Sequence, residues 1–336
     1  MIKVSITIPC RNEQDYIGKC LQSIVDCSFN KSFLSVYVCD GLSNDNTAKI
    51  IQSFADKHPF IHYIENKKQS TPFALNLGLK ADDADIKIIL GAHAEIYPNY
   101  IEKCIEAFQF DKQLGCVGGF IENVYENETA EVIGKAMSSG FGVGNAHFRT
   151  GAADGYVDTV AFGAYKREVF DKIGYFDEEL IRNQDDEFNF RLLKHGFKIY
   201  LFREIRSMYY VRASFNKLYK QYFQYGYWKV YVNKKHHTIT TLRQIVPLLF
   251  VLYLFGGAMI SFLHPIILIM YIMVLIFYFA AGIYFASKLD SQLNLKFKIV
   301  KSFFILHYSY GLGYLKGIFD FFILKKSIKK DESLSR

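Results

Sequence analysis

Val4-Ser5-Ile6-Thr7-Ile8-Pro9-Cys10-Arg11-Asn12-Glu13 is an apolar run that ends in polar residues. Its first six positions are rich in isoleucine, valine and threonine, which predicts a buried β-strand. Parallel sheets built from such strands bind their ligands at the carboxyl ends of the strands. The polar residues from Arg11 to Glu13 occupy an end of this kind.

The pattern continues through the first 90 residues. Helical spacing over residues 15–27 is followed by a strand-like run at residues 34–40, and the alternation reaches a further apolar run at residues 86–90. Strands that alternate with helices predict an α/β fold, in which a mostly parallel sheet carries helices on both faces. We therefore expect Asp40 and His93, which end or follow strands, to share one edge of the sheet.

Composition and charge restrict the class of protein. The net charge is +7, but residues 231–336 hold 13 Lys and Arg against 4 Asp and Glu, whereas residues 1–230 are nearly neutral. A basic, apolar tail fits anionic lipid rather than nucleic acid. The six cysteines all precede residue 117 and form no CxxC pair. They are therefore expected as buried free thiols in a reducing compartment.

The C-terminal part predicts membrane helices. Residues 245–263 and 266–286 carry no charge, and His264-Pro265 separates them. Each run is long enough to cross a hydrocarbon core of ~30 Å. Lysines and arginines flank both ends of the pair, and no signal peptide precedes the first strand. We expect a multi-pass protein of the inner (plasma) membrane with a cytoplasmic body. The alternative is a buried helical hairpin in a soluble protein.

Two further segments carry structural expectations. Residues 299–324 are apolar but contain charged side chains, which favours an interfacial or re-entrant helix over a third span. Residues 140–155 are rich in glycine and alanine and are expected to form a loop that closes over a substrate.

Short motifs in a fixed order carry the functional information, because P-loop, GxGxxG, GxSxG and HExxH patterns are all missing from the sequence. The motifs are Ile8-Pro9-Cys10-Arg11-Asn12-Glu13, Val38-Cys39-Asp40-Gly41-Leu42-Ser43-Asn44-Asp45, Ala74-Leu75-Asn76-Leu77-Gly78, Gly91-Ala92-His93-Ala94, Phe162-Gly163-Ala164-Tyr165 and Arg182-Asn183-Gln184-Asp185-Asp186-Glu187. Together they resemble family-two inverting glycosyltransferases of the GT-A fold, most of all the membrane-bound exopolysaccharide enzymes of the succinoglycan type.

The resemblance covers about residues 3–230 and implies a GT-A catalytic domain at residues 1–230, followed by a membrane region at residues 231–336. It implies transfer of a hexose from a nucleotide sugar, expected to be a UDP-sugar, to a lipid-linked glycan acceptor in exopolysaccharide or capsule assembly. Two alternatives are a polyprenyl- or dolichyl-phosphate sugar synthase and a non-catalytic, sugar-nucleotide-binding membrane scaffold.

The resemblance also implies a nucleotide site. Glu13 and Asp40 would accept hydrogen bonds from the base and ribose, beside the backbone near Pro9, and Arg11 would add positive charge. Lys68 stands where family members often carry a basic residue near the nucleotide. A solvated surface lysine is the alternative for Lys68.

The metal motif departs from the family pattern. Family members usually carry Asp-x-Asp, which holds Mg²⁺ or Mn²⁺ against the departing diphosphate. Here the triplet is Gly91-Ala92-His93. His93 is the expected ligand, with possible help from Glu95, and an imidazole suits Mn²⁺ better than Mg²⁺. The alternative is a histidine that contacts the donor without a metal.

Asp185 is the expected general base, which deprotonates the acceptor hydroxyl. Family members carry an arginine six residues after the base, and Arg191 stands six residues after Asp185. Asp186 is assigned to the acceptor side. Glu187 is expected to be a charged residue in the first turn of a helix.

Three more residues are assigned to the acceptor and lipid side: Asp158, Arg212 and Trp228. Trp228 has two readings, an acceptor-stacking ring or an anchor at the membrane interface. It ends Gln224-Tyr225-Gly226-Tyr227-Trp228, where processive members carry Gln-x-x-Arg-Trp. Tyrosine in place of the arginine weakens the case for processive synthesis.

Overall fold

A computed structural model describes residues 1–144, 146–151, 153–211, 213–240 and 242–326. The chain forms two compact units. We call Met1–Val124 with His147–Tyr210 the sheet unit, and Tyr125–Ala146 with Val211–Arg336 the helical unit. The helical unit thus begins earlier in the chain than the expected membrane region at residues 231–336, and the boundary at residue 230 remains a prediction.

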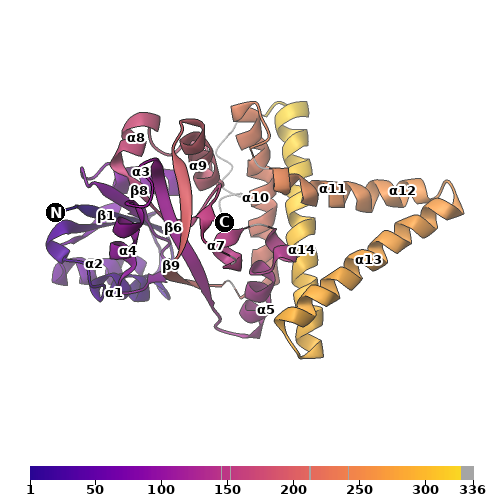
Figure 1. Ribbon diagram of the computed structural model, residues 1–336, viewed down its shortest axis with the longest axis horizontal. Coiled ribbons are helices and arrows are strands. Elements are labelled where there is room, and N and C mark those ends of the chain that lie inside the picture. The colour runs from indigo at the N-terminus through magenta and orange to yellow at the C-terminus, as the bar shows by residue number, and fades with distance from the viewer. Residues whose placement is uncertain (145, 152, 212, 241, 327–336) are drawn as a thin grey trace. The chain divides into compact units, whose positions relative to one another are not determined.

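The sheet unit is built on one mixed sheet, whose strands are coloured from indigo to salmon in Figure 1. The strands are β1 (Val4–Cys10), β2 (Leu34–Asp40), β3 (Ile61–Glu65), β4 (Ile86–Ile89), β5 (Ala94–Ile96), β6 (Leu114–Val124), β7 (Gly155–Tyr156), β8 (Ala161–Lys166) and β9 (Lys198–Tyr210). Their order is β3-β2-β1-β4-β8-β6-β9-β5, with β7 paired to β9. The first four strands of this order are parallel, whereas β8 is antiparallel to both of its neighbours. The expected α/β fold is confirmed.

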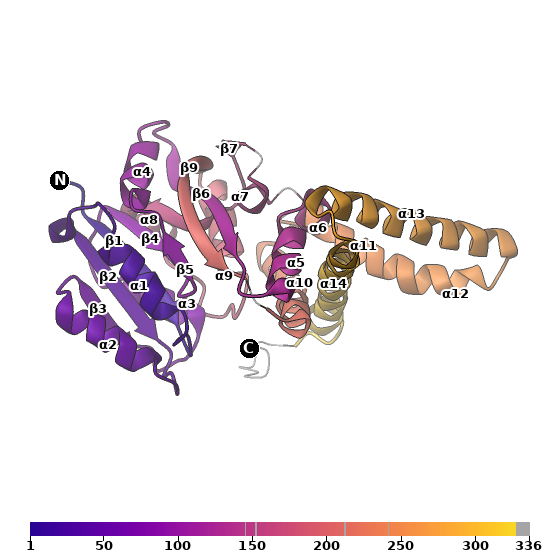
Figure 2. The ribbon, with the colours of Figure 1, turned by 90° about the horizontal axis from the view of Figure 1, so that it is seen from below.

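Helices cover both faces of the sheet. One hydrophobic cluster joins the sheet to α1 (Ile17–Val25), α2 (Thr47–Lys57) and α4 (Tyr100–Ala107), and Figure 2 shows α1 and α2 lying along the strands. A second cluster holds α3 (Thr71–Leu79), α8 (Arg167–Ile173) and α9 (Gln184–Lys194). Successive side chains of β1 point to opposite faces of the sheet, and those of Val4, Ile6 and Ile8 pack in the first cluster.

Thr7 of β1 faces the opposite side and meets α3. A Cβ added at Gly78 would lie 2.5 Å from Cγ2 of Thr7, so only glycine allows α3 to approach this closely. The Ala74-Leu75-Asn76-Leu77-Gly78 motif is thus a packing motif. It fixes a helix on the sheet and contributes no reacting group.

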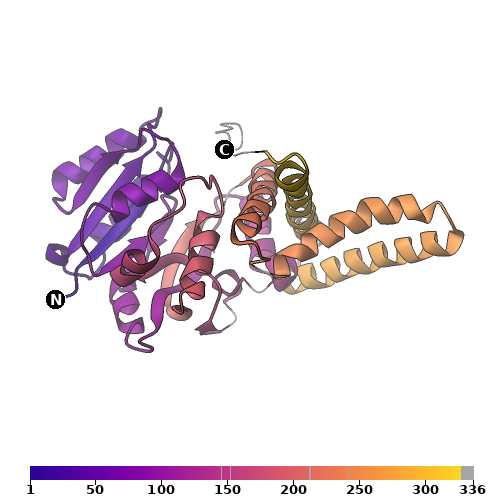
Figure 3. The same ribbon diagram turned by 90° about the horizontal axis from the view of Figure 1, so that it is seen from above.

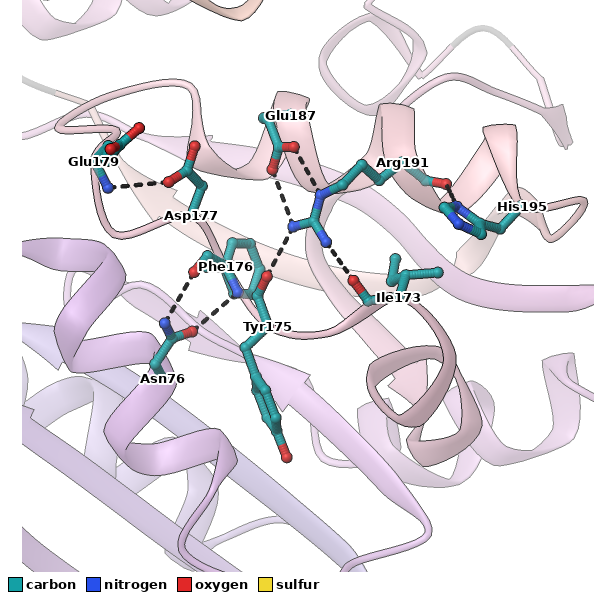
Figure 4. Close-up of polar contacts among 9 residues, drawn as sticks. All are labelled: Asn76, Ile173, Tyr175, Phe176, Asp177, Glu179, Glu187, Arg191 and His195. Atoms are coloured by element: carbon teal, nitrogen blue, oxygen red, sulfur yellow. Dashed lines mark hydrogen bonds and ion pairs between the residues drawn. The ribbon is translucent and has the colours of Figure 1, made fainter. Parts of the chain in front are cut away.

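Arg191 holds the start of α9 in place, as Figure 4 shows. Its guanidinium forms a two-bonded ion pair with Glu187, with Nε to Oε1 at 2.7 Å and Nη2 to Oε2 at 3.0 Å. It also donates to the carbonyls of Ile173 at 2.6 Å and Tyr175 at 2.7 Å. Glu187 is 1% exposed, so the pair is buried. One side chain therefore joins α9 to the segment that follows α8.

Asn76 makes a second connection to the same segment. Its amide donates to the carbonyl of Phe176 and to Oε1 of Glu178, each at 2.9 Å, and its Oδ1 accepts from the Phe176 N–H at 3.0 Å. Figure 4 shows this contact beside the one made by Arg191. The segment between α8 and α9 is thus tied to α3 and to α9.

The helical unit consists of α5 (Glu128–Met137), α6 (Gly140–Val143), α10 (Phe215–His236), α11 (Val246–Leu252), α12 (Ala258–Ser261), α13 (Pro265–Leu289) and α14 (Leu293–Ile318). α10 and α14 pack through glycines. A Cβ at Gly226 would lie 2.0 Å from the carbonyl oxygen of Tyr310, and one at Gly313 would lie 2.0 Å from that of Phe223. Close backbone approach of this kind is typical of helix pairs in membranes.

The expected break at His264-Pro265 is present, and a helical hairpin forms around it. α11, a π-helical turn (Tyr253–Gly257) and α12 make one arm, and α13 makes the other (Figure 3). α13 has 25 residues, or ~37 Å at 1.5 Å per residue. It is the one described helix long and apolar enough to cross a membrane, whereas the other arm, Val246–Ser261, is shorter. Multi-pass topology therefore remains a prediction.

The expected interfacial helix at residues 299–324 is part of a longer one. α14 runs from Leu293 to Ile318, and a π-helical turn (Phe319–Ile323) follows it. In the helical unit, α14 runs across the direction of α11 and α12 in Figure 1. One of its faces is buried against α10 and α11 through glycines, which explains its small residues.

The expected loop at residues 140–155 is wrong for most of its length. α6 and α7 (His147–Thr150) are short helices, and β7 follows them. Phe141 packs on Phe285 and Phe303, with ring centroids 5.2 and 5.0 Å away. The Gly-rich composition reflects tight packing, since a Cβ at Gly142 would lie 2.2 Å from the carbonyl oxygen of Ala136.

The cysteine prediction is confirmed. Cys10, Cys20, Cys27, Cys39, Cys104 and Cys116 are all buried and free. Burial raises the pKa of Cys39 to about 12, so this side chain is a neutral thiol at physiological pH.

Arg191→Met should destabilise the sheet unit by about 3–5 kcal/mol, because it leaves the Glu187 carboxylate buried without its partner. Denaturant unfolding of the full-length protein in detergent, followed by circular dichroism, measures the change. The double variant Glu187→Leu/Arg191→Met should recover most of the loss, because it removes both charges. Arg167→Met is the control at an exposed arginine and should change stability by less than about 0.5 kcal/mol. Equal stability of Arg191→Met and Arg167→Met would refute the structural role of the pair.

Candidate active site

The candidate site lies where the strands end and α9 begins. Four non-glycine residues there have a left-handed backbone: Asn12 (φ 53°), Leu42 (φ 55°), Phe162 (φ 49°) and Asn183 (φ 61°). Such conformations persist only where the surrounding structure imposes them, and they gather at functional sites. Asn12 and Leu42 follow β1 and β2, and Asn183 directly precedes α9.

Asp40 has its oxygens engaged within the protein. It is 1% exposed, Oδ2 accepts from the Ser43 N–H at 3.0 Å and from the Tyr63 hydroxyl at 3.4 Å, and Oδ1 accepts from the Ser43 hydroxyl. This pattern shapes the turn after β2. Burial and the charge of Asp40 raise the pKa of Tyr63, so its hydroxyl stays protonated.

The other four expected nucleotide residues differ in their surroundings. Pro9 and Glu13 are half-buried at the end of β1, and the Glu13 N–H donates to the Thr47 hydroxyl at 2.7 Å. The Arg11 side chain lies against Gly41, where an added Cβ would be 3.2 Å from Cδ of Arg11. Lys68 is exposed, which favours its alternative as a solvated lysine.

The metal position has an altered first residue. A Cβ at Gly91 would lie 3.0 Å from Cε1 of Phe162, so the Phe162 ring limits the space that a carboxylate would need there. His93 is half-buried, and its Nδ1 lies 3.7 Å from Oε1 of Glu13. The Glu95 carboxylate instead accepts from the hydroxyl of Tyr210. Glu13 is therefore the carboxylate beside His93. Glu95 is less available as a second metal ligand, because its carboxylate already accepts the Tyr210 hydrogen bond.

These residues fit a divalent cation only in part. Within the described part of the chain, no three His, Cys, Asp or Glu side chains gather into a metal site. His93 and Glu13 offer an imidazole and a carboxylate, a pair that suits Mn²⁺. A cation held by two protein ligands takes its remaining oxygens from the substrate or water, as Mg²⁺ and Mn²⁺ do with phosphates.

Three adjacent acids at the start of α9 have three different environments. Asp185 is exposed, Asp186 is half-buried and Glu187 is buried in its ion pair with Arg191. Glu187 lies in the first turn of α9, as expected, and it is a structural residue because it is buried against Arg191. The same ion pair gives Arg191 a positioning role.

A hydrogen-bonded network supports α9 behind Asp185. The Tyr165 hydroxyl donates to Oδ1 of Asn189 at 3.1 Å, and the Asn189 amide donates to the Thr159 hydroxyl at 2.9 Å. Burial, together with the nearby charges of Cys116 and Asp185, raises the pKa of Tyr165. The network connects α9 to the segment that carries Asp158, which is half-buried. Tyr165 lies in a quoted motif, whereas Asn189 gave no signal in the sequence.

The two remaining expected residues do not join this site as described. Arg212 lies outside the described residues. Trp228 is 3% exposed and packs in the helical unit with Tyr227, Tyr231 and Phe321. A ring buried to this extent is a core residue. This corrects both readings of Trp228, the acceptor-stacking ring and the interfacial anchor.

Comparisons with known proteins identify the family. The family model described as Glycosyl transferase family 2 matches residues 5–174. The chain is 35% identical over 231 residues to the dolichyl N-acetyl-alpha-D-glucosaminyl phosphate 3-beta-D-2,3-diacetamido-2,3-dideoxy-beta-D-glucuronosyltransferase of Methanococcus voltae, covering 66% of this chain and 71% of that protein. It is 28% identical over 257 residues to the succinoglycan biosynthesis protein ExoA of Rhizobium meliloti, covering 75% and 76%.

A solved structure extends the likeness to the fold. The mannosyltransferase PcManGT from Pyrobaculum calidifontis, in complex with GDP-Man and Mn²⁺, matches with a TM-score of 0.62 at 17% identity, over 95% of this chain and 87% of that one. The expected GT-A fold is confirmed. The chain belongs to glycosyl transferase family 2 and is a glycosyltransferase.

Proposed function

We propose that this enzyme transfers a hexose, with inversion, from a UDP-sugar to a hydroxyl of a lipid-linked glycan. The observation that carries the proposal is the arrangement at the start of α9. There an exposed carboxylate, Asp185, stands on a helix that the buried pair of Glu187 and Arg191 holds in place. A base must be accessible to the acceptor and fixed in position, and Asp185 combines both properties.

The proposed mechanism uses one proton transfer. Asp185 accepts the proton of the acceptor hydroxyl as its oxygen attacks the anomeric carbon, and the bond to the donor phosphate breaks. Pro9, Arg11 and Glu13 border the nucleoside in this proposal. The buried Asp40 shapes the turn after β2 on the same side, and Glu13 also lies beside His93. A divalent cation, when bound, would neutralise charge on the leaving diphosphate. His93 and Glu13 are the residues that would hold it.

The acceptor proposal draws on the relatives and on α13. The protein from Methanococcus voltae is named for a dolichyl-phosphate-linked sugar acceptor, and the one from Rhizobium meliloti for succinoglycan biosynthesis. Large apolar side chains on the hairpin are exposed, for example Phe262 at 91% and Phe277 at 76%. Such a surface requires an apolar surrounding, which a bilayer that holds the acceptor lipid provides. Assembly of an exopolysaccharide or capsule repeat unit fits these features.

We further propose that the hairpin crosses or enters the inner (plasma) membrane while the sheet unit stays in the cytoplasm. α13 is 25 residues long, and Lys288 stands at its C-terminal end. The positive charges on both sides of the hairpin favour the cytoplasmic face for both ends. A polyprenyl- or dolichyl-phosphate sugar synthase is the second candidate. A product with a single sugar on a bare lipid phosphate would favour it.

Asp185→Asn should lower transfer about 10²- to 10⁴-fold, because only the proton acceptor is lost. Transfer is followed as release of the nucleotide from several UDP- and GDP-sugars in the presence of a lipid extract. Binding of the nucleoside diphosphate should stay at the wild-type level. Asp186→Asn, at the neighbouring acid assigned to the acceptor side, is the comparison and should keep more activity than Asp185→Asn. Near wild-type turnover by Asp185→Asn would disprove the base, and the reverse result for the two variants would move the role to Asp186.

Mn²⁺ should strengthen the binding of the nucleoside diphosphate to the wild-type protein, and His93→Asn should remove most of that effect. Isothermal titration calorimetry with and without Mn²⁺ measures it. Glu95→Gln is the control, because the Glu95 carboxylate is already bonded to Tyr210. If Mn²⁺ acts equally on His93→Asn and the wild type, His93 is not a ligand.

Ile276→Arg/Phe277→Arg should weaken membrane insertion, since each arginine at the centre of a membrane helix costs about 2.5–3.5 kcal/mol. Resistance of the full-length protein to carbonate extraction from membranes is the measurement. Leu193→Arg is the control at an exposed apolar residue of the sheet unit, and it should stay in the membrane fraction. Extraction of the wild-type protein by carbonate would contradict insertion.

A further inference from the structure

Arg149 lies in an aromatic cluster around His93. We define the His93 cluster as His93, Phe162 and Tyr209. The Tyr209 ring stands edge-on to the His93 ring with centroids 5.1 Å apart, and it lies 6.4 Å from the Phe162 ring. The guanidinium carbon of Arg149 is 5.6 Å from the centroid of Tyr209 and 5.4 Å from that of Phe148. The Tyr209 ring thus contacts both Arg149 and His93, the candidate metal ligand.

The Arg149 guanidinium has unused hydrogen-bonding capacity. Its Nη1 is buried and finds no hydrogen-bond partner in the described part of the chain. A guanidinium carries five N–H donors and is always charged. A buried donor without an acceptor is costly, and a cation without a counter-charge is more so. Arg191 and Arg206 differ, because Arg191 pairs with Glu187 and Arg206 pairs with Glu122.

Packing of Arg149 against aromatic rings does not by itself explain why its Nη1 is buried without a hydrogen-bond acceptor. The face of an aromatic ring attracts a guanidinium, but it leaves the N–H groups in the guanidinium plane without acceptors. Those groups match the oxygens of a phosphate, which arginine binds through two parallel hydrogen bonds. The unused donors therefore point to an anionic ligand.

The backbone fixes α7, which carries Arg149, to the sheet. Gly151 ends this short helix with φ 63°, and its N–H donates to the carbonyl of His147 at 2.9 Å. A Cβ at Gly151 would lie 2.8 Å from the ring of Phe120 in β6. Glycine is required here by its conformation and by its close contact, so Arg149 stands on an anchored segment.

Phe162 connects this observation to the altered metal position. Its ring takes the space beside Gly91 where family members carry a carboxylate, and the same ring belongs to the His93 cluster. The site therefore has fewer carboxylates to hold a cation against the diphosphate. Arg149, which packs on Tyr209 of this cluster, offers positive charge by another route.

We propose that Arg149 binds the phosphate groups of the donor's nucleoside diphosphate and takes over part of the charge neutralisation that a complete metal motif would provide. This proposal rests on the proposed function, because it assumes a nucleoside diphosphate donor. Arg149 was not among the residues expected from the sequence, and it contributes a positive charge on the Tyr209 ring, which also packs against His93.

Nucleotide binding to the full-length protein in detergent tests the proposal. UDP and GDP are first titrated into the wild type by calorimetry, and the one that binds is then compared with its monophosphate. Arg149→Met should weaken diphosphate binding about 10- to 100-fold, because a charged hydrogen-bond donor is lost. It should also shrink the preference for the diphosphate over the monophosphate about tenfold. Arg149→Lys should lie between, and Arg167→Met should match the wild type.

The preference ratio separates phosphate binding from a structural role. A loose or misfolded variant would weaken both nucleotides together, so an unchanged ratio in Arg149→Met overturns the proposal. If Arg149→Met does not fold, an unchanged ratio in Arg149→Lys overturns it equally, since lysine keeps the charge but loses the paired donors. A wild-type protein that binds neither diphosphate refutes the proposed donor class itself. Normal wild-type binding with an unaffected variant refutes only the role of Arg149.

Discussion

The buried ion pair of Glu187 and Arg191 is the contact on which the arrangement of the active site depends. Four hydrogen bonds from one guanidinium join two oxygens of Glu187 to the carbonyls of Ile173 and Tyr175. Each backbone carbonyl that leaves water needs a donor, and a buried carboxylate needs a counter-charge. Arg191 meets both needs, so α9 and the segment after α8 are fixed together. The first turn of α9, which carries Asp185, is held by that contact.

The three neighbouring acids at the start of α9 differ in burial, and each therefore has a different role. Glu187 faces the core and serves structure, Asp186 is half-buried, and Asp185 faces solvent. Successive residues of a helix point in directions about 100° apart, so adjacent acids need not share an environment. The spacing of six between Asp185 and Arg191 therefore has a physical meaning. It places the positioning arginine on the buried side of the helix and the proposed base on the open side.

The opposite side of the site uses aromatic rings where a metal motif would use carboxylates. Phe162, with φ 49°, directs its ring toward Gly91, and Tyr209 lies against His93. The Glu95 carboxylate contacts the Tyr210 hydroxyl. In the proposed mechanism, charge for the leaving diphosphate comes from a cation that His93 helps to hold and from Arg149. In the helical unit, the small size of Gly226 and Gly313 lets the backbones of α10 and α14 come into contact.

The sequence by itself determined the fold class, the free thiols, the break at His264-Pro265 and the membership of a glycosyltransferase family. These features depend on local patterns, such as apolar periodicity, uncharged runs and ordered motifs, which need no knowledge of distant contacts. The tertiary structure decided which chemically similar residues are free to act. Trp228 became a core residue because α10 packs on the segment after α14, and α6 formed where a loop was expected because Phe141 found partners more than 140 residues away. Arg149 gave no signal in the sequence, since the ring of Tyr209 that packs on it comes from the distant strand β9. Burial and long-range contact depend on how the elements pack together, and no local pattern records them.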